Sequence, residues 1–114
     1  MKSLNGFIIY NDLMVKILSF GFASGITFWP FIFINVKSKN SPTLLNHERI
    51  HIRQQLETLL IGFYIIYFLE YLYYRLTMTR IDAYKKISFE KEAYLFETDL
   101  TYLDKRKSFA WLRF

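Results

Sequence analysis

Hydrophobic and polar positions divide the chain into two apolar blocks followed by a polar C-terminal part. Residues 1–36 carry three charged side chains, and residues 58–74 carry one. Residues 75–114, in contrast, carry nine Lys or Arg and six Asp or Glu. A soluble domain of this size normally spreads its charges, so the pattern predicts a single membrane-associated domain over residues 1–114.

The first apolar block predicts an N-terminal segment, residues 1–36, that combines a helix with a strand or hairpin. The stretch 13–34 is long enough to span a bilayer, which takes roughly 20 residues. Lys16 interrupts this stretch, and glycines and a proline break it. We therefore expect a spanning or re-entrant helix over 13–24. A strand is expected over 26–34, because these residues are β-branched and aromatic.

The second apolar block predicts one long helix over residues 42–76. Ser41 is typical of a helix N-cap, and Pro42 suits the first helical position. At 1.5 Å per residue such a helix is about 50 Å long, more than the thickness of a bilayer core. Its second half, 59–69, is apolar on every side and must be buried in protein or in lipid. Membrane lipid is the expected partner; the alternative is the core of a small soluble dimer.

The C-terminal part, residues 80–114, predicts two further helices and an aromatic tail. A short helix is expected over 82–87. Ser88 is typical of an N-cap for a last helix over 89–104, whose apolar residues recur at helical spacing. The tail 109–114 either packs against the helices or anchors the chain at an interface. The predicted fold class is therefore mainly α with a short β element.

Composition narrows the function classes. Hydrophobic residues make up 53% of the 114 residues and aromatic residues 20%, which excludes a disordered chain. The net charge is +5, but the basic residues are scattered, so nucleic acid is not expected as a partner and an anionic membrane surface is. With no Cys, the chain has neither disulfides nor thiolate ligands.

Candidate chemistry lies at His47-Glu48-Arg49-Ile50-His51, an HExxH motif on the predicted long helix. Positions i and i+4 share one helix face, so His47 and His51 can hold one metal ion, with Zn²⁺ as the expected cofactor. Glu48 lies about 100° around the helix, within reach of a water molecule on the metal. The alternative is a solvated polar turn, but the two histidines of the chain both fall in the motif.

A zinc ion needs a third protein ligand, and the chain offers no further His and no Cys. A carboxylate is therefore expected. Glu57 faces the opposite side of the helix from the motif, and Glu70 lies about five turns along it. The downstream candidates are Glu57, Glu70, Asp82, Glu90, Glu92, Glu97 and Asp99.

With these residues in view, the chain resembles a minimal gluzincin metallopeptidase, a family that pairs HExxH with a Glu on a following helix. It is most similar to membrane-embedded members, namely the antirepressor-type sensor peptidases and the group of CaaX-prenyl and stress proteases. Trp29 to Ile34 stands in the strand position, 59–69 supplies the apolar stretch, and Glu90-Lys-Glu-Ala-Tyr94 stands in the third-ligand position. The resemblance covers roughly residues 26–97 and implies a zincin-like core.

By this resemblance His47, His51 and Glu90 are the metal ligands and Glu48 is the general base. Glu92 is the rival third ligand. Tyr94 replaces the Asp that usually orients a histidine ligand in the family, which bears on the catalytic rate more than on ligation.

Two further groups of side chains are candidates for the cleft. Gln54 lies one turn after the motif and either lines the cleft or forms hydrogen bonds on the helix surface. A hydroxyl donor for an oxyanion is expected from Tyr84, Tyr94 or Tyr102.

The predicted function is zinc-dependent hydrolysis of a peptide or protein substrate. A non-catalytic metal-binding or structural membrane protein is the alternative. The chain also resembles small bacterial membrane proteins of unassigned activity that carry His-Glu-x-Ile-His-x-x-Gln-Gln. This similarity leads us to expect a bacterial inner-membrane location.

Overall fold

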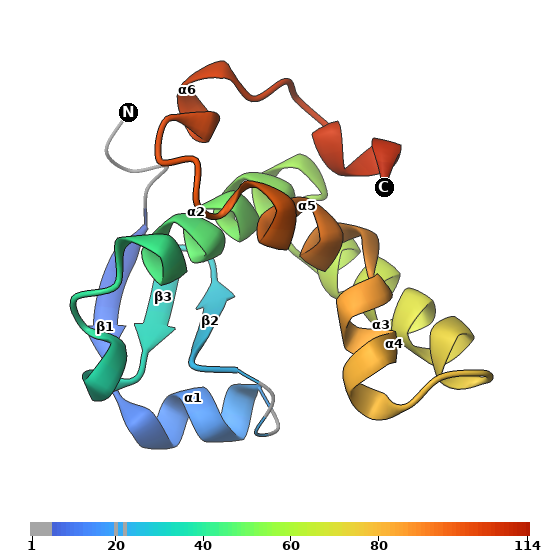
Figure 1. The fold of residues 1–114 in the computed structure, drawn as a ribbon, viewed down its shortest axis with the longest axis horizontal. Coiled ribbons are helices and arrows are strands. Elements are labelled where there is room, and N and C mark those ends of the chain that lie inside the picture. Colours follow the sequence, from blue (N-terminus) through green and yellow to red (C-terminus); the bar gives the residue numbers. More distant parts are fainter. Residues whose placement is uncertain (1–5, 20, 22) are drawn as a thin grey trace.

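The computed structural model describes residues 6–19, 21 and 23–114, and these form a mainly helical fold around a small three-stranded sheet (Figure 1). This confirms the predicted class of a mainly α chain with a short β element. The HExxH helix crosses the centre of the molecule, with the sheet on one side and the C-terminal helices on the other (Figure 1).

The sheet consists of β1 (Phe7–Tyr10), β2 (Gly25–Phe28) and β3 (Phe31–Ile34) in the order β1-β3-β2. The predicted strand over 26–34 is thus an antiparallel hairpin of β2 and β3, and the chain turns between them at Trp29 and Pro30. β1 adds in parallel to β3, so β2 is an edge strand of the sheet.

The predicted spanning helix over 13–24 is instead α1 (Asp12–Leu18), which connects β1 to the hairpin. Its first turn is capped by the Asn11 side chain, which accepts a hydrogen bond from the Met14 N–H at 3.0 Å. The part of the prediction that falls on residues 20 and 22 lies outside the described residues.

The predicted continuous helix over 42–76 is wrong: α2 (Pro42–Glu57) and α3 (Ile61–Arg75) are separate helices bent by 110°. The N-terminus of α2 is as predicted, since the Ser41 side chain accepts a hydrogen bond from the Leu44 N–H. The break follows from Leu59 and Leu60, whose φ angles are 57° and 64°, outside the right-handed helical region. No single helix in the described part of the chain is long and apolar enough to cross a membrane, although the bent pair passes that test together.

The remaining helices are α4 (Arg80–Lys86), α5 (Ser88–Phe96) and α6 (Tyr102–Lys105), with 3₁₀ turns η2 (Val36–Ser38) and η3 (Ala110–Arg113). The predicted helix over 89–104 is therefore interrupted between α5 and α6.

The N-cap of α5 is Ile87 rather than Ser88, and no side chain of the helix itself caps it. The Glu70 carboxylate on α3 takes that role, accepting from the Ser88 N–H at 2.9 Å and from its hydroxyl at 2.7 Å.

The buried apolar side chains form three clusters around α2 and α5. The first joins α3, α5 and the tail through Phe63, Phe89 and Trp111, whose ring lies 4.7 Å from that of Phe89. The tail therefore packs against the helices, one of its two predicted roles. The other two clusters hold α2 against the sheet and against α5, and their buried members are Ile32, Ile34, Ile52, Ile50, Ala93 and Tyr102.

Candidate metal centre

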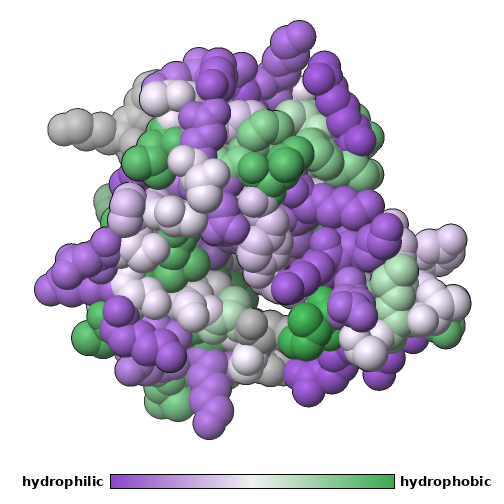
Figure 2. Space-filling model, viewed as in Figure 1, coloured by the Kyte–Doolittle hydropathy of each residue, from purple (hydrophilic) through white to green (hydrophobic). Residues whose placement is uncertain are grey.

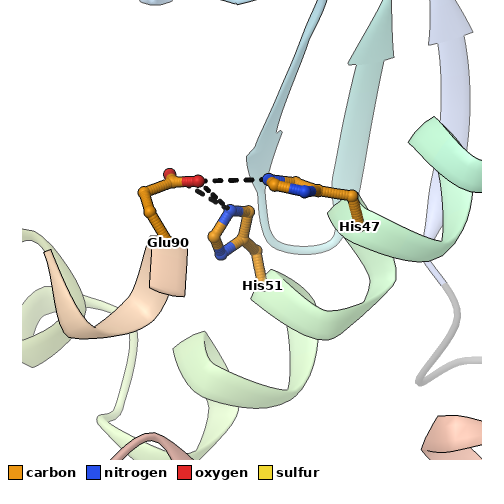
Figure 3. Close-up of side chains that lie close together, drawn as sticks. All are labelled: His47, His51 and Glu90. Carbon is orange, nitrogen blue, oxygen red and sulfur yellow. Dashed lines mark hydrogen bonds and ion pairs between the residues drawn. The ribbon is translucent and has the colours of Figure 1, made fainter. Parts of the chain in front are cut away.

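The two histidines of the motif share one face of α2 and point at Glu90 of α5 (Figure 3). The Nε2 atoms of His47 and His51 lie 3.1 and 3.2 Å from Glu90 Oε1. One donor atom from each of the three residues lies within 4.8 Å of the others, so the group can hold a metal ion. All three side chains are buried. The predicted ligand set His47, His51 and Glu90 is thus brought together in space.

Both ends of α5 are fixed by side chains of other helices, which determines where Glu90 lies. Glu70 binds the first turn, as described above. At the other end, the Asn46 amide of α2 donates to the carbonyl oxygens of Phe96, Glu97 and Asp99, at 2.9 to 3.2 Å. Asn46 is adjacent to His47. The turn of α2 that carries His47 therefore also holds α5, the helix that carries Glu90.

The second oxygen of Glu90 is occupied by a tyrosine. The Tyr67 hydroxyl on α3 donates to Glu90 Oε2 at 2.6 Å. Burial, together with the nearby Glu90 charge, raises the pKa of Tyr67 well above its usual value, so the hydroxyl keeps its proton. This hydrogen bond leaves Glu90 Oε1 directed at the two imidazoles. The sequence analysis did not identify Tyr67, because its position depends on the bend between α2 and α3.

Gln54 fixes the tautomer of His51. Its amide nitrogen donates to the Phe89 carbonyl at 3.0 Å and to Glu92 Oε1 at 2.9 Å, so the amide oxygen must face His51 Nδ1, 2.7 Å away. An amide oxygen only accepts, so Nδ1 carries the proton and Nε2 keeps its lone pair for a metal. Gln54 is fully buried, and the expected surface hydrogen bonding is therefore wrong.

Glu92 is not placed as a third ligand. Its carboxylate accepts hydrogen bonds from Gln54, from the Tyr102 hydroxyl at 2.6 Å and from Arg106. Arg106 in turn forms a two-pronged ion pair with Glu57. Glu92 is therefore linked to His51 only indirectly, through Gln54. The Tyr102 hydroxyl donates to Glu92, so it is not available to an oxyanion at the candidate site.

His47 has its own carboxylate partner. Its Nδ1 lies 3.9 Å from Glu97 Oε1, and the Tyr94 ring packs edge-on against the imidazole, 4.6 Å between centroids. In the family that the sequence resembles, an Asp at the position of Tyr94 would be expected beside a histidine. In this chain the carboxylate that lies near His47 belongs to Glu97 instead. The spacing offered a signal for it, since Glu97 follows Glu90 by two helical turns and shares its face.

The two remaining carboxylate candidates lie outside the metal cluster. Asp99 accepts from Thr101 and pairs with Lys105 at 2.9 Å, and Asp82 is exposed on α4.

Glu48 faces the edge strand β2 rather than Glu90. The Thr27 hydroxyl lies 2.8 Å from Glu48 Oε1 and 3.0 Å from the Glu48 carbonyl oxygen, so its one proton is shared between them. A Cβ atom at Gly25 would lie 3.4 Å from the Glu48 carboxyl group, so a side chain there would crowd it.

A cavity of about 410 Å³ lies beside the cluster, between β2 and α3. Glu48, His51 and Glu90 contribute its polar wall, and Tyr84 lies in the same wall. Most of the remaining surface is apolar or aromatic. The lining also includes Leu18, Gly25, Thr27, Tyr64, Tyr67 and Phe68.

The charges of the cluster favour an ion pair when no metal is bound. Burial lowers the pKa of His47, but its hydrogen bond to Glu90 and the nearby carboxylates of Glu97 and Glu48 outweigh burial and raise it to about 10. For Glu90, burial raises the pKa, and the charges and hydrogen bonds of the two histidines outweigh it and hold the value well below the usual range. A proton on His47 thus neutralises the Glu90 carboxylate.

No known protein family, curated protein or solved structure matches this chain. Two imidazole nitrogens and one carboxylate oxygen form a donor set that suits Zn²⁺ and leaves positions for other ligands. The tautomer fixed by Gln54 and the Glu90 oxygen that faces both imidazoles fit such an ion.

Proposed function

We propose that the chain is a zinc-dependent peptidase of gluzincin type, with His47, His51 and Glu90 as ligands and Glu48 as general base. The observation that supports it most is the shared cavity wall of Glu48, His51 and Glu90. A carboxylate that is not needed as a ligand thus lies beside the ligand set, in a space that can admit a peptide side chain.

The roles of the residues follow from their positions. Zinc held by this set would supply Lewis-acid chemistry, polarising a peptide carbonyl and making a water molecule acidic near pH 7. Glu48 Oε2 is the atom free to take the water proton, since Thr27 occupies Oε1, and it returns that proton to the leaving amine. Of the three tyrosines expected as hydroxyl donors, Tyr84 lies in the cavity wall, where burial raises its pKa and its hydroxyl keeps its proton in a hydrogen bond with Tyr94.

The outer edge of β2 gives an extended peptide a place to bind. Gln55 and Tyr64 already donate to the Thr27 carbonyl, at 2.8 and 3.0 Å. Gly25, two residues earlier, presents its backbone groups on the same outer side of the strand. A substrate therefore pairs at Gly25, next to the Glu48 carboxyl group.

The test combines zinc content with turnover of a quenched fluorescent peptide library. Wild-type protein should hold one zinc per chain, and His51→Ala and Glu90→Ala should lose it, whereas the matched carboxylate control Asp82→Ala should keep it. Glu48→Gln should keep zinc and lose at least a hundredfold in kcat/KM. Zinc retained in Glu90→Ala, or lost in Glu48→Gln, contradicts these roles.

A second function, a structural metal site without catalysis, is favoured by the burial of the ligands. His47, His51 and Glu90 are only 3 to 5% exposed, as structural zinc sites are. In that case wild type and Glu48→Gln bind zinc alike and neither cleaves any peptide of the library.

A further inference from the structure

The outer face of α3 is apolar along its whole length. Exposed side chains recur every three or four residues and therefore form one stripe. Each is at least 45% exposed, and none is charged: Ile61, Ile65, Phe68, Leu69, Leu72, Tyr73 and Leu76. A surface helix normally presents polar residues to water, so this stripe indicates a binding face.

The stripe meets the mouth of the cavity at the metal centre. Phe68 belongs to the stripe, being 59% exposed, and also lines the cavity. Leu18 of α1 also lines the cavity, and Ile17 and Leu13 of the same helix are 56% and 65% exposed. Exposed apolar residues therefore adjoin the cavity on both α1 and α3.

On the face of the molecule drawn in Figure 2, apolar patches lie between hydrophilic side chains.

The charge around α3 indicates which kind of surface binds to the apolar stripe. Residues 61–86 carry four basic side chains and two acidic ones. These side chains leave a net charge of +2 over this stretch. Lys85 and Lys86 are exposed on α4, which packs against α3. A positively charged apolar face suits an anionic lipid surface, whereas two copies of it would repel each other.

The bend between α2 and α3 makes the geometry feasible. Because α2 leaves the corner at 110° to α3, α3 can lie in the plane of a bilayer surface while α2 and the sheet stay outside it (Figure 1). Leu59, at the corner, is 85% exposed and extends the apolar surface.

We propose that the outer face of α3 docks on the surface of an anionic bilayer and that the cavity opens onto that surface. The docking stands independently of chemistry at the metal centre. Its consequence, that a peptide reaches Glu48 from the lipid interface, rests on the proposed function.

Sedimentation with phosphatidylglycerol–phosphatidylcholine vesicles tests the docking. Wild type should bind. The double substitution Ile65→Asp and Leu69→Asp should weaken vesicle binding at least tenfold, because it places two charges in the apolar stripe. Neither residue lines the cavity, so the metal centre itself is not altered. The matched control Leu95→Asp with Leu100→Asp makes the same charge change at equally exposed sites on α5 and after it, and should change binding less than threefold. Equal losses in the two pairs, or no binding by wild type, overturn the proposal.

A probe experiment keeps the test valid if the aspartate variants fail to fold. The chain has no cysteine, so Leu69→Cys and Leu95→Cys each give one labelling site for an environment-sensitive dye. Vesicles should shift the emission of the dye at 69 to the blue and leave the dye at 95 unchanged. No shift at 69, or a shift at 69 that grows with protein concentration without lipid, overturns the proposal; the latter indicates a second copy as occupant.

Zinc content, measured on the same samples, separates the two proposals. Variants that keep zinc and lose vesicle binding leave the proposed function intact. Wild type that binds vesicles but neither zinc nor peptide leaves the docking intact and removes the proposed function.

Discussion

At the scale of single residues, the amide of Gln54 links the metal centre to the rest of the core. It is held by the Phe89 carbonyl and the Glu92 carboxylate, and Glu92 is held by Arg106. The proton on His51 Nδ1 is therefore determined by residues that never touch the ligand-binding face. Outer hydrogen bonds of this kind typically change metal affinity by about 10–100-fold.

Replacing Gln54 by Leu should weaken zinc binding by about 10–100-fold, because it keeps the volume and removes the acceptor for Nδ1–H. Competition with a chromophoric chelator measures the affinity. Gln55→Leu is the matched control, since Gln55 is also buried but bonds to β2 and not to a histidine. Similar losses in both variants would show that the effect comes from general destabilisation.

Zinc binding should release at least one proton per ion at pH 7. The reason is the pKa of about 10 of His47 in the metal-free site, where Nε2 carries a proton that zinc must displace. Affinity should rise about tenfold per pH unit between pH 6 and 8 and fall as the pH is lowered. Calorimetry in buffers of different ionisation enthalpy counts the protons; a count of zero contradicts the ion pair with Glu90.

At the scale of elements, the corner between α2 and α3 determines the fold. Leu59 lies in the left-handed region, and Leu60 forms a three-residue turn in which the Ile61 N–H donates to the Leu59 carbonyl at 2.6 Å. Leucine is unfavourable at a positive φ by about 1–2 kcal/mol. The corner is nevertheless what turns α3 back to place Tyr67 and Glu70 against α5.

Leu59→Gly should raise the free energy of unfolding by about 1 kcal/mol. It removes the Cβ clash at positive φ and loses little burial, because the side chain is 85% exposed. Urea unfolding followed by circular dichroism measures the change. The matched control Leu69→Gly, inside α3, should instead cost about 1 kcal/mol. Destabilisation by both substitutions would argue against strain at the corner.

The same corner explains what the sequence could and could not predict. His47, His51 and the start of α2 follow from local rules, namely the i, i+4 spacing and the Ser41–Pro42 cap. Glu90 came from resemblance to a family. No Gly, Asn or Pro marks residues 58–60, so the periodicity predicted one helix through them. Tyr67 could not be assigned, because its role depends on the long-range placement of α3 against α5.

At the scale of the whole molecule, zinc binding should stabilise the native state against unfolding. Residues 47–51 and Glu90 lie on different helices, so the unfolded chain has no preformed site and binding favours the fold. Zinc at a thousand times its dissociation constant should add about 4 kcal/mol to the free energy of unfolding. Thermal unfolding with and without chelator measures it. No shift for wild type, or an equal shift for His51→Ala, contradicts the site.

The separation of His47 and Glu90 along the chain gives the site a further consequence. An ion shared by these residues closes a loop of about 43 residues, and a covalent bridge across such a loop is worth about 4 kcal/mol in chain entropy. Such an ion would serve as the crosslink of a chain that has no sulfur bridge. Such a crosslink does not respond to reductants or oxidants. Its strength instead follows the supply of free zinc, so the lifetime of the folded chain would report metal availability in its surroundings.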